Sequence, residues 1–235
     1  MKYSKFLSPR YWISKLFPTE HVGIIPKKEI YRYLPDSPII VEAGAHIGTD
    51  TLDMAKLWQD ATIHAFEPVP HLFEILSKNT EGVKNIHTYP LALGETTGLI
   101  SIHISSGKSD GSSSVLKPKR HLEIHPDVFF ENTIKVEAIT LDDWAKNHNI
   151  KQIDMLWLDL QGFELNVLKK SQSILRGITA IYTEVNLVET YENAASYDAL
   201  KEWLSIFGFS VVSEALPWSD AGNVLFVNMN KVDKK

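Results

Sequence analysis

The sequence predicts an α/β protein whose mainly parallel sheet carries helices on both faces. Short apolar runs rich in β-branched and aromatic residues alternate with longer segments of helical periodicity, and this alternation is typical of βαβ units. Two more strand-like runs follow the last long helix and predict a closing C-terminal β-hairpin. Together these runs predict a sheet of seven strands.

Five runs are expected to form the parallel strands, because each is short and apolar and is bounded by turn residues or helical patterns. The predicted parallel strands are Ile39–Ala45, Thr62–Glu67, Ile86–Leu93, Ile153–Leu160 and Ile178–Val185. The predicted helices are Thr51–Trp58, Leu72–Asn79, Glu164–Leu175 and Tyr197–Phe207, and the hairpin consists of Phe209–Glu214 and Val224–Asn228. After Leu93, "GLISIHIS" predicts an exposed strand, and the glycine, serine and proline that follow predict a mobile surface segment.

The composition is that of one globular domain. The chain has 235 residues, of which 44% are hydrophobic and 23% are charged, so it can bury a large core. Its formal net charge of −5 argues against nucleic acid as a partner, because nucleic-acid-binding proteins carry a basic face. Cysteine is absent, which excludes disulfides, thiolate metal sites and cysteine nucleophiles. No apolar run approaches the ~20 residues of a transmembrane helix, and we expect a soluble, cytoplasmic protein.

Three regions are predicted along the chain. Residues 1–22 form a basic amphipathic extension that lacks the apolar core and cleavage site of a secretory signal. It fits either a helix on a membrane surface or a helix, broken near Pro9, that packs on its own domain or on a second subunit of a homodimer. Residues 23–235 form the main domain, and a lid-like insertion is expected at about residues 105–130.

The stretch "IIVEAGAHIGTD", residues 39–50, joins the first predicted strand to the first predicted helix. In open α/β sheets, ligands bind in the crevice outside the carboxyl ends of the strands, and this turn lies there. Gly44 and Gly48 allow a sharp bend and a close approach of the backbone to a ligand, while Glu42 places a carboxylate at the strand end. A tight turn without a ligand is the alternative interpretation.

A second acidic residue, Glu67, ends the next strand. A carboxylate at this place in the fold accepts hydrogen bonds from both hydroxyls of a ribose, so a nucleoside-containing ligand is expected. Residues 44–48 read G-A-H-I-G and lack the G-x-G-x-x-G spacing of dinucleotide folds. Glu42 is a poor neighbour for a diphosphate and a good neighbour for an ammonium group, which favours S-adenosylmethionine.

Several motifs occur in a fixed order along residues 23–228. They are "VEAGAHIG", "FEP", "DGSSSVLKP", "HP", "ITLDDW", "IDMLWLDLQGFE" and "IYTEV". In this order they resemble the FkbM-type S-adenosylmethionine-dependent methyltransferases, whose patterns include a D-x-G-A-N-x-G turn and an I-D-x-x-K-x-D-x-E-G-x-E block. The chain departs from these patterns at Glu42 (Asp in the family), His46 (Asn), Trp157 (Lys) and Gln161 (Glu). The last two departures affect any mechanism that needs the lysine or the glutamate.

The resemblance implies a Rossmann-like class I methyltransferase fold. It also implies transfer of a methyl group from S-adenosylmethionine, with S-adenosylhomocysteine as product, to a hydroxyl of a sugar, a glycan or a secondary metabolite. The residues expected to bind the cofactor are Glu42, Gly44, Ala45, His46, Gly48, Glu67 and Asp159.

An acceptor hydroxyl has to lose a proton, so a general base is expected near the strand ends. Asp159, at the end of the fourth parallel strand, is the first candidate, and His46 is the second. Capping of the following helix and binding of the cofactor's ammonium group are alternative roles for Asp159. A divalent metal ion on Asp159 and Glu184 is allowed by ligand chemistry but is not expected, because no spacing motif supports it.

Contacts with the acceptor are expected from the strand ends and from the insertion. The residues are Gln161, Glu164, Glu184, Ser113 and His121. Helix capping is the alternative role of Glu164, and a buried polar network is the alternative role of Glu184. His121 and His125 lie in the segment predicted to be mobile, so solvation is the alternative for both.

Two other functions stay open at this point. One is an NAD(P)-dependent oxidoreductase, which the glycine spacing disfavours. The other is a non-catalytic nucleoside-binding protein, which the changes at Trp157 and Gln161 allow. The fold alone does not choose the acceptor.

Overall fold

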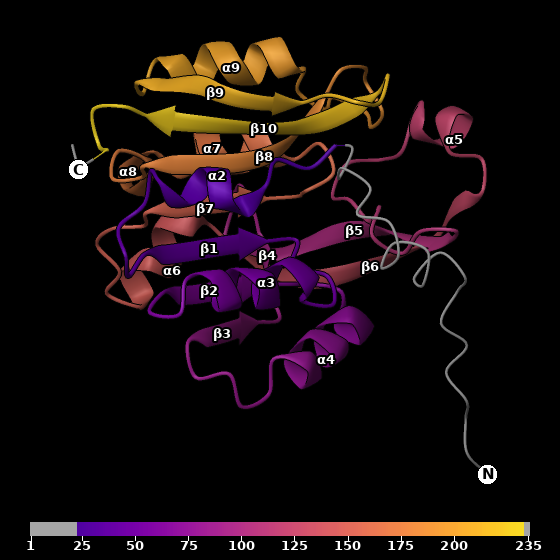
Figure 1. Ribbon diagram of the computed structural model, residues 1–235. Helices are drawn as coiled ribbons and strands as arrows, with labels where there is room; N and C mark the ends of the chain where they lie inside the picture. Colours follow the sequence, from indigo (N-terminus) through magenta and orange to yellow (C-terminus); the bar gives the residue numbers. More distant parts are fainter. Residues whose placement is uncertain (1–22, 233–235) are drawn as a thin grey trace, which may run out of the picture.

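The computed structural model describes residues 23–232, which form a central sheet with helices on both faces (Figure 1). The strands of this sheet are β1 (Ile39–Ala43), β2 (Thr62–Phe66), β3 (Ile86–Tyr89), β7 (Met155–Leu158), β8 (Ala180–Asn186), β9 (Phe209–Ala215) and β10 (Ala221–Asn228). Their spatial order is β3-β2-β1-β7-β8-β10-β9. All neighbours from β3 to β8 are parallel, whereas β10 is antiparallel to both β8 and β9. The predicted α/β class, the seven strands and the closing hairpin are confirmed.

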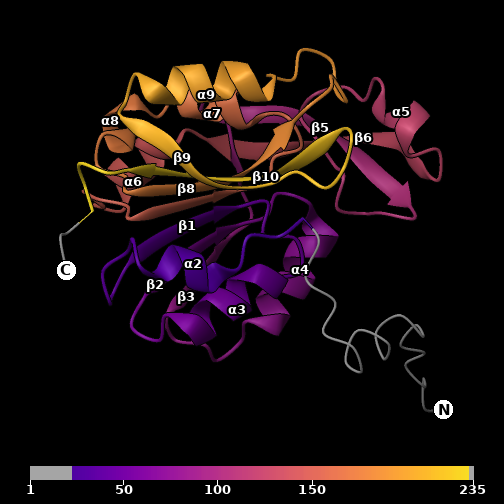
Figure 2. The ribbon, with the colours of Figure 1, turned by 45° about the horizontal axis from the view of Figure 1, so that its top comes forward.

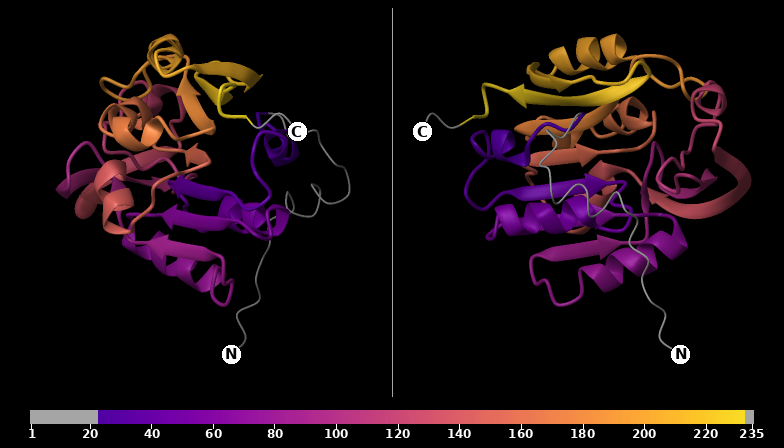
Figure 3. Two further views of the ribbon diagram at one scale, coloured as in Figure 1. Left: turned by 90° about the vertical axis from the view of Figure 1, so that its left-hand side faces the viewer. Right: turned by 45° about the vertical axis from the view of Figure 1, so that its right-hand side comes forward.

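The helices divide between the two faces of the sheet as the alternation of side chains along each strand requires. On β7, Leu156 and Leu158 belong to one hydrophobic cluster, and Met155 and Trp157 belong to another. The first cluster includes residues of α6 (Leu141–Asn147), α7 (Glu164–Lys169), α8 (Gln172–Leu175) and α9 (Tyr197–Ser205). The second face carries α2 (Lys27–Tyr31), α3 (Thr49–Leu57) and α4 (Pro70–Asn79), as Figure 2 and Figure 3 show.

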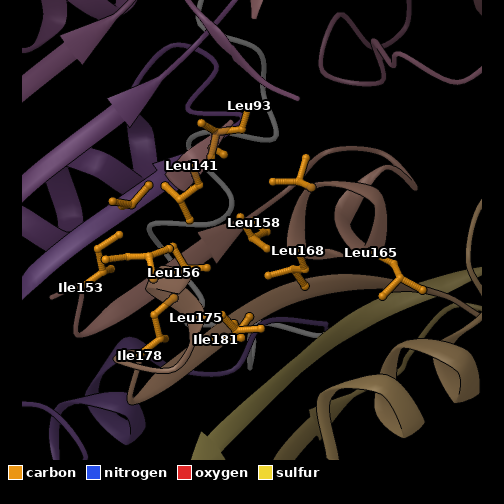
Figure 4. Packing of buried hydrophobic residues seen from close by; sticks show 14 of the residues in the cluster. Leu93, Leu141, Ile153, Leu156, Leu158, Leu165, Leu168, Leu175, Ile178 and Ile181 are labelled. Atoms are coloured by element: carbon orange, nitrogen blue, oxygen red, sulfur yellow. The ribbon is translucent and has the colours of Figure 1, made fainter. Parts of the chain in front are cut away.

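The larger cluster centres on β7 (Figure 4). Leu156 and Ile181 are fully buried, and Ile153, Leu168 and Leu175 are fully buried around them. Full burial of a side chain of this kind stabilises the fold by about 1.5–3 kcal/mol. This packing holds β7 between β1 and β8 and thereby sets the positions of the strand ends.

A second sheet lies at the carboxyl ends of the parallel strands. It consists of β4 (Ala92–Leu93), β6 (Val128–Ile139) and β5 (Gly98–Gly107), in that spatial order. The short helix α5 (His121–Ile124) lies between β5 and β6 in the chain. Figure 1 shows this sheet and α5 to the right of β1 and β2. They stand at the edge of the main sheet where open α/β folds bind ligands.

The predicted strand Ile86–Leu93 is divided in the structure. Pro90 lacks the amide hydrogen that a continuing ladder needs, so β3 ends at Tyr89. The chain then leaves the main sheet, and Ala92–Leu93 pairs with β6 instead.

The predicted helix Glu164–Leu175 is also divided, into α7 and α8. Ser171 lies at the break and donates its hydroxyl hydrogen to the carbonyl of Val167 at 2.7 Å, a local bond that competes with helix continuation. The insertion is more regular than its composition predicted. The exposed strand "GLISIHIS" is confirmed as part of β5, and β6 begins at Val128, inside the insertion predicted at about residues 105–130.

The N-terminal extension predicted at residues 1–22 lies outside the described residues. Its membrane-surface and subunit-packing interpretations therefore stay predictions, as does the homodimer. None of the helices within residues 23–232 has the length and apolar character needed to cross a membrane. A cytoplasmic location also stays a prediction.

Candidate active site

The turn between β1 and α3 packs its backbone against the end of β7. A Cβ atom on Gly44 would lie 2.0 Å from the backbone oxygen of Asp159, so this approach requires glycine. Gly44 and Gly48 both have φ of 85°, and His46 has φ of 51°, in the left-handed region that glycine adopts without strain. The turn and Asp159 are thus held side by side at the strand ends.

Glu67 ties this turn to the end of β2. Its carboxylate accepts hydrogen bonds from the backbone N–H groups of His46 and Val69, both at 2.8 Å and one on each oxygen. Glu67 is 4% exposed, and burial raises the pKa of its carboxyl to about 7. An ionised carboxylate has about four lone-pair sites, so about two remain for a ligand.

Glu42 lies buried at the end of β1. It accepts a hydrogen bond of 2.5 Å from the hydroxyl of Thr51, and burial raises the pKa of its carboxyl to about 8. Nearby, Lys27 of α2 forms an ion pair with Asp50 in the first turn of α3. The ammonium of Lys27 also lies 4.9 Å from the centre of the Trp157 ring.

Gln161 joins two carboxylates at the ends of β7 and β8. Its Nε2 group donates to Asp159 Oδ1 at 2.7 Å and to Glu184 Oε2 at 2.9 Å. Its Oε1 atom lies 2.9 Å from the hydroxyl of Tyr191, which also lies 2.7 Å from the carbonyl of Ser112. Desolvation raises the pKa of both carboxyls, and the charge of Asp159 raises the pKa of Glu184 further. Asp159 itself is exposed toward its cavity.

A first cavity of about 250 Å³ lies over the turn. Leu72, Leu93 and Phe163 contribute to its apolar wall, and carboxylates dominate its polar wall. These carboxylates belong to Glu42, Asp50, Glu67, Asp110 and Asp159. His46 also lines the cavity, with its Nε2 atom 2.9 Å from Asp110 Oδ1. Of the residues predicted to bind a cofactor, Gly48 does not line the cavity and shapes the turn behind it.

A second cavity of about 490 Å³ adjoins the first, because Gly111 lines both. It lies between the insertion and the ends of β8 and β10. Its lining includes Gln161, Glu184, His121, His125, Tyr191, Trp218 and Asp220. The hydrogen-bonded chain Asp159–Gln161–Glu184 divides the cavities, since Asp159 lines the first and Glu184 lines the second.

The residues predicted to contact an acceptor do not all meet in one place. Gln161, Glu184 and His121 line the second cavity, and Ser113 lines the first. Glu164 lines neither: it is 3% exposed and accepts hydrogen bonds from the backbone N–H groups of Leu160 (2.8 Å) and Gly162 (3.2 Å). Both N–H groups belong to the turn before α7, whose N-terminus has no side-chain cap hydrogen bond, so Glu164 holds this turn.

His121 is buried at 5% exposure, so its predicted solvation is wrong. Its ring lies among those of His125, Phe130 and Tyr191, with centroids 4.8, 5.2 and 5.3 Å away. Burial, assisted by the neighbouring His125, lowers the pKa of His121 to about 4, so its imidazole is neutral at neutral pH. Within residues 23–232, Nδ1 of His121 has no hydrogen-bond partner.

The insertion is fastened to the loop that follows β8. The backbone N–H of Lys119 donates to the carbonyl of Thr190 at 2.9 Å. Two exposed ion pairs, Lys119–Glu189 (2.6 Å) and Lys117–Glu192 (3.3 Å), lie beside this bond. Exposed pairs contribute about 0–1 kcal/mol each, so these ion pairs add little to the backbone hydrogen bonds of this contact. The lid role of the insertion stays a prediction.

Several cavity residues gave no signal in the sequence. Asp110 and Tyr191 lie in loops without periodicity, and their places depend on how the insertion docks. Asp220 had a usable signal: it directly precedes the final strand of the hairpin, which returns beside β8. An acidic residue at such a strand start faces the same edge of the sheet as the parallel strand ends.

The arrangement of His, Asp and Glu side chains does not support a metal site. Within the part of the chain that the structure describes, no group of three or more His, Asp or Glu side chains is arranged to hold a metal ion. Asp159 and Glu184 share the amide group of Gln161. A metal ion on this pair stays an untested alternative.

The strand order, the glycine turn after β1 and the cavity at the strand ends define a Rossmann-like α/β protein. Residues 42–211 match the family model described as the methyltransferase FkbM domain. The chain belongs to this family and is a methyltransferase.

Known proteins of this kind align over most of the chain. It is 31% identical over 199 residues to the 2-O-methyltransferase NoeI of Sinorhizobium fredii, an alignment that covers 83% of this chain and 80% of that protein. It is 22% identical over 153 residues to the hexuronic acid methyltransferase AglP of Haloferax volcanii, covering 64% and 57%. The crystal structure of the FkbM methyltransferase from Methylobacillus flagellatus shares the fold, with a TM-score of 0.53 at 14% identity over 82% of this chain and 44% of that chain.

Proposed function

We propose that this protein is an S-adenosylmethionine-dependent O-methyltransferase that acts on a hydroxyl of a sugar, a glycan or a secondary metabolite. The observation that carries the proposal is the pair of adjoining cavities at the carboxyl ends of the parallel strands, which share Gly111 and are divided by Gln161. A methyl donor and a methyl acceptor need adjoining sites, because the reacting atoms have to meet in line.

The charge of the first cavity supports this cofactor. Five carboxylates line it, and no lysine or arginine of residues 23–232 does. An ammonium and a sulfonium are attracted by such a lining, whereas a pyrophosphate is repelled. The lining therefore favours S-adenosylmethionine over a nicotinamide dinucleotide.

Individual residues fit parts of this cofactor. Glu67 is proposed to hold the ribose hydroxyls, because its carboxylate keeps lone pairs free after binding two backbone N–H groups. Glu42 is proposed to hold the ammonium group. Burial raises the pKa of its carboxyl to about 8, and a bound cation favours its ionised form. Gly44 has no side chain, so a ligand can approach the backbone of the turn closely.

When bound, S-adenosylmethionine supplies an electrophilic methyl group. The protein has to hold the acceptor in line and to accept its proton. Asp159 is the proposed base, because it lines the first cavity and is linked through Gln161 to the second, and its raised pKa suits a proton acceptor. A positioned base contributes about 10²–10⁴-fold to the rate. His46 is the second candidate; it lines only the first cavity, beside Asp110.

The acceptor class is supported by two independent observations. The relatives NoeI and AglP are named as a 2-O-methyltransferase and a hexuronic acid methyltransferase. Most residues that line the second cavity are of polar types, and Trp218 adds an exposed aromatic ring, a combination that suits a hydroxyl-rich ligand.

Two measurements test the proposal. Calorimetry should show binding of S-adenosylmethionine and S-adenosylhomocysteine and no binding of NADH. Incubation with S-adenosylmethionine and a panel of sugars, glycans and hydroxylated metabolites should yield a product one methyl group heavier, detected by mass spectrometry, with equimolar S-adenosylhomocysteine. Binding of NADH alone would overturn the proposal. Cofactor binding without product across the panel would favour the non-catalytic nucleoside-binding protein.

A further inference from the structure

We propose that the second cavity takes an uncharged sugar ring and excludes uronic acids. The inference rests on the proposed function for the reaction and adds the class of acceptor. It is carried by the charges and the exposed aromatic ring that meet where the insertion approaches the β9–β10 turn (Figure 1).

Two acids form the sheet side of the cavity. Glu184 lies near the end of β8, and Asp220 directly precedes β10, which pairs with β8. Asp220 is 7% exposed, and its side chain bonds only to His125 among the described residues. A carboxylate on the acceptor would meet the like charge of Asp220 at this wall, which is a strong cost in a desolvated site.

The basic groups of the cavity do not offset these acids. Lys108 lines the cavity, but its ammonium lies 3.8 Å from the carboxylate of Asp127, which lines it as well. His125 lies 2.9 Å from Asp220, so this pair carries no net positive charge whichever form its imidazole takes. No arginine of residues 23–232 lines the cavity, and arginine is the side chain that recognises carboxylates with two parallel hydrogen bonds.

His121 contributes a neutral wall to the cavity. Its imidazole lines the cavity and is 5% exposed, and burial lowers its pKa to about 4. A neutral imidazole brings no positive charge toward a carboxylate, so His121 does not offset the acids either.

Trp218 provides an apolar surface at the mouth of the cavity. Trp218 is 47% exposed. Its ring packs against the backbone of Gly23, where an added Cβ atom would lie 2.5 Å from Trp218 Cη2. A rigid aromatic ring fixed in this way contributes contact area at low entropic cost, with its apolar body open to a ligand. The C–H face of a sugar ring is a suitable partner for it.

Binding to the protein loaded with S-adenosylhomocysteine tests the proposal without turnover. The probes are matched pairs of methyl glycosides, each pair consisting of a neutral hexose and its uronic acid, titrated by saturation-transfer NMR. We expect the neutral glycosides to bind and the uronates to bind at least about tenfold more weakly. Equal or tighter binding of the uronates would overturn the proposal, and so would failure of every neutral glycoside to bind.

Two variants and a control locate the effect. Trp218→Ala should weaken binding of the neutral glycosides about tenfold, and Asp220→Asn, which keeps the size of the side chain and removes its charge, should narrow the gap between neutral and uronate probes. Asp60→Asn changes an exposed aspartate away from both cavities and should alter neither result. Unchanged discrimination in folded Asp220→Asn would refute the electrostatic argument. Calorimetry with S-adenosylhomocysteine tests the proposed function separately. A failure of the proposed function can therefore be distinguished from a failure of the sugar-selectivity proposal.

Discussion

Replacement of Glu67 by glutamine is expected to weaken both the fold and the binding of S-adenosylmethionine. Each carboxylate oxygen accepts one backbone N–H group, from His46 and from Val69. Glutamine has a single oxygen, so its NH₂ group would face one of these N–H groups and leave that amide unsatisfied, at a cost of about 1–3 kcal/mol. For a chain of this size, each kcal/mol lowers the melting temperature by about 2–4 °C.

The effect on the ligand is separate. Loss of a hydrogen bond between a ribose hydroxyl and a charged acceptor costs roughly 1.5–3 kcal/mol, or about 10–150-fold in the dissociation constant. Calorimetry with S-adenosylhomocysteine measures this loss, and urea denaturation measures the stability. Glu74→Gln, on the exposed side of α4, is the control and should change neither quantity. An unchanged affinity in folded Glu67→Gln would refute the ribose assignment even if the melting temperature fell.

Asp159→Asn should lower the single-turnover rate about 10²–10⁴-fold with nearly unchanged affinity for S-adenosylhomocysteine; a loss confined to cofactor affinity would assign Asp159 to the ammonium group. Amide hydrogen exchange of residues 105–130 should slow when cofactor and acceptor are both bound, and full protection in the free protein would count against a moving lid. Because burial raises the pKa of Glu42 from 4.5 to about 8, its protonated form favours folding at low pH. His64 and His121, whose pKa values burial lowers from 6.5 to about 4, act in the opposite direction below pH 6.5. The free protein should therefore lose stability as pH rises from 6.5 to 8, and urea midpoints that instead rise over this range would contradict this.

The main sheet was predictable because its strands are determined locally. β1, β2, β7 and β8 are short apolar runs, buried on both faces and bounded by turns or helical patterns. β6 was missed, because its sequence, "VFFENTIKVEAI", is exposed over much of its length and is a strand through its pairing with β5. Tertiary pairing of this kind leaves little trace in local periodicity.

The two cavities were predictable to different degrees. Glu42, Glu67 and Asp159 stand at strand ends, and the rule for open α/β sheets places such residues together. The positions of Tyr191 and Asp220 depend instead on the docking of the insertion on the loop after β8 and on the antiparallel return of β10. These are contacts between distant segments, so the cofactor side of the site could be read from the chain and most of the acceptor side could not.

Trp157 replaces the lysine of the family pattern, but another lysine, Lys27, lies beside it. The Trp157 ring stacks on Tyr182, with centroids 3.7 Å apart and an interplanar angle of 13°. Lys27 reaches this ring from α2 and pairs with Asp50, which lines the first cavity. A lysine therefore still neutralises an acid at the cavity wall, although a different element supplies it.

Gln161, where the family pattern has glutamate, is explained by its neighbours. A glutamate at this position would place a third carboxylate beside Asp159 and Glu184, whose pKa values burial already raises. The amide instead donates to both carboxylates and accepts from Tyr191, so it orients Asp159 at the boundary of the two cavities without adding charge. The hydrogen bonds of Gln161 therefore explain the amide at this position as a contact that positions Asp159, the proposed base.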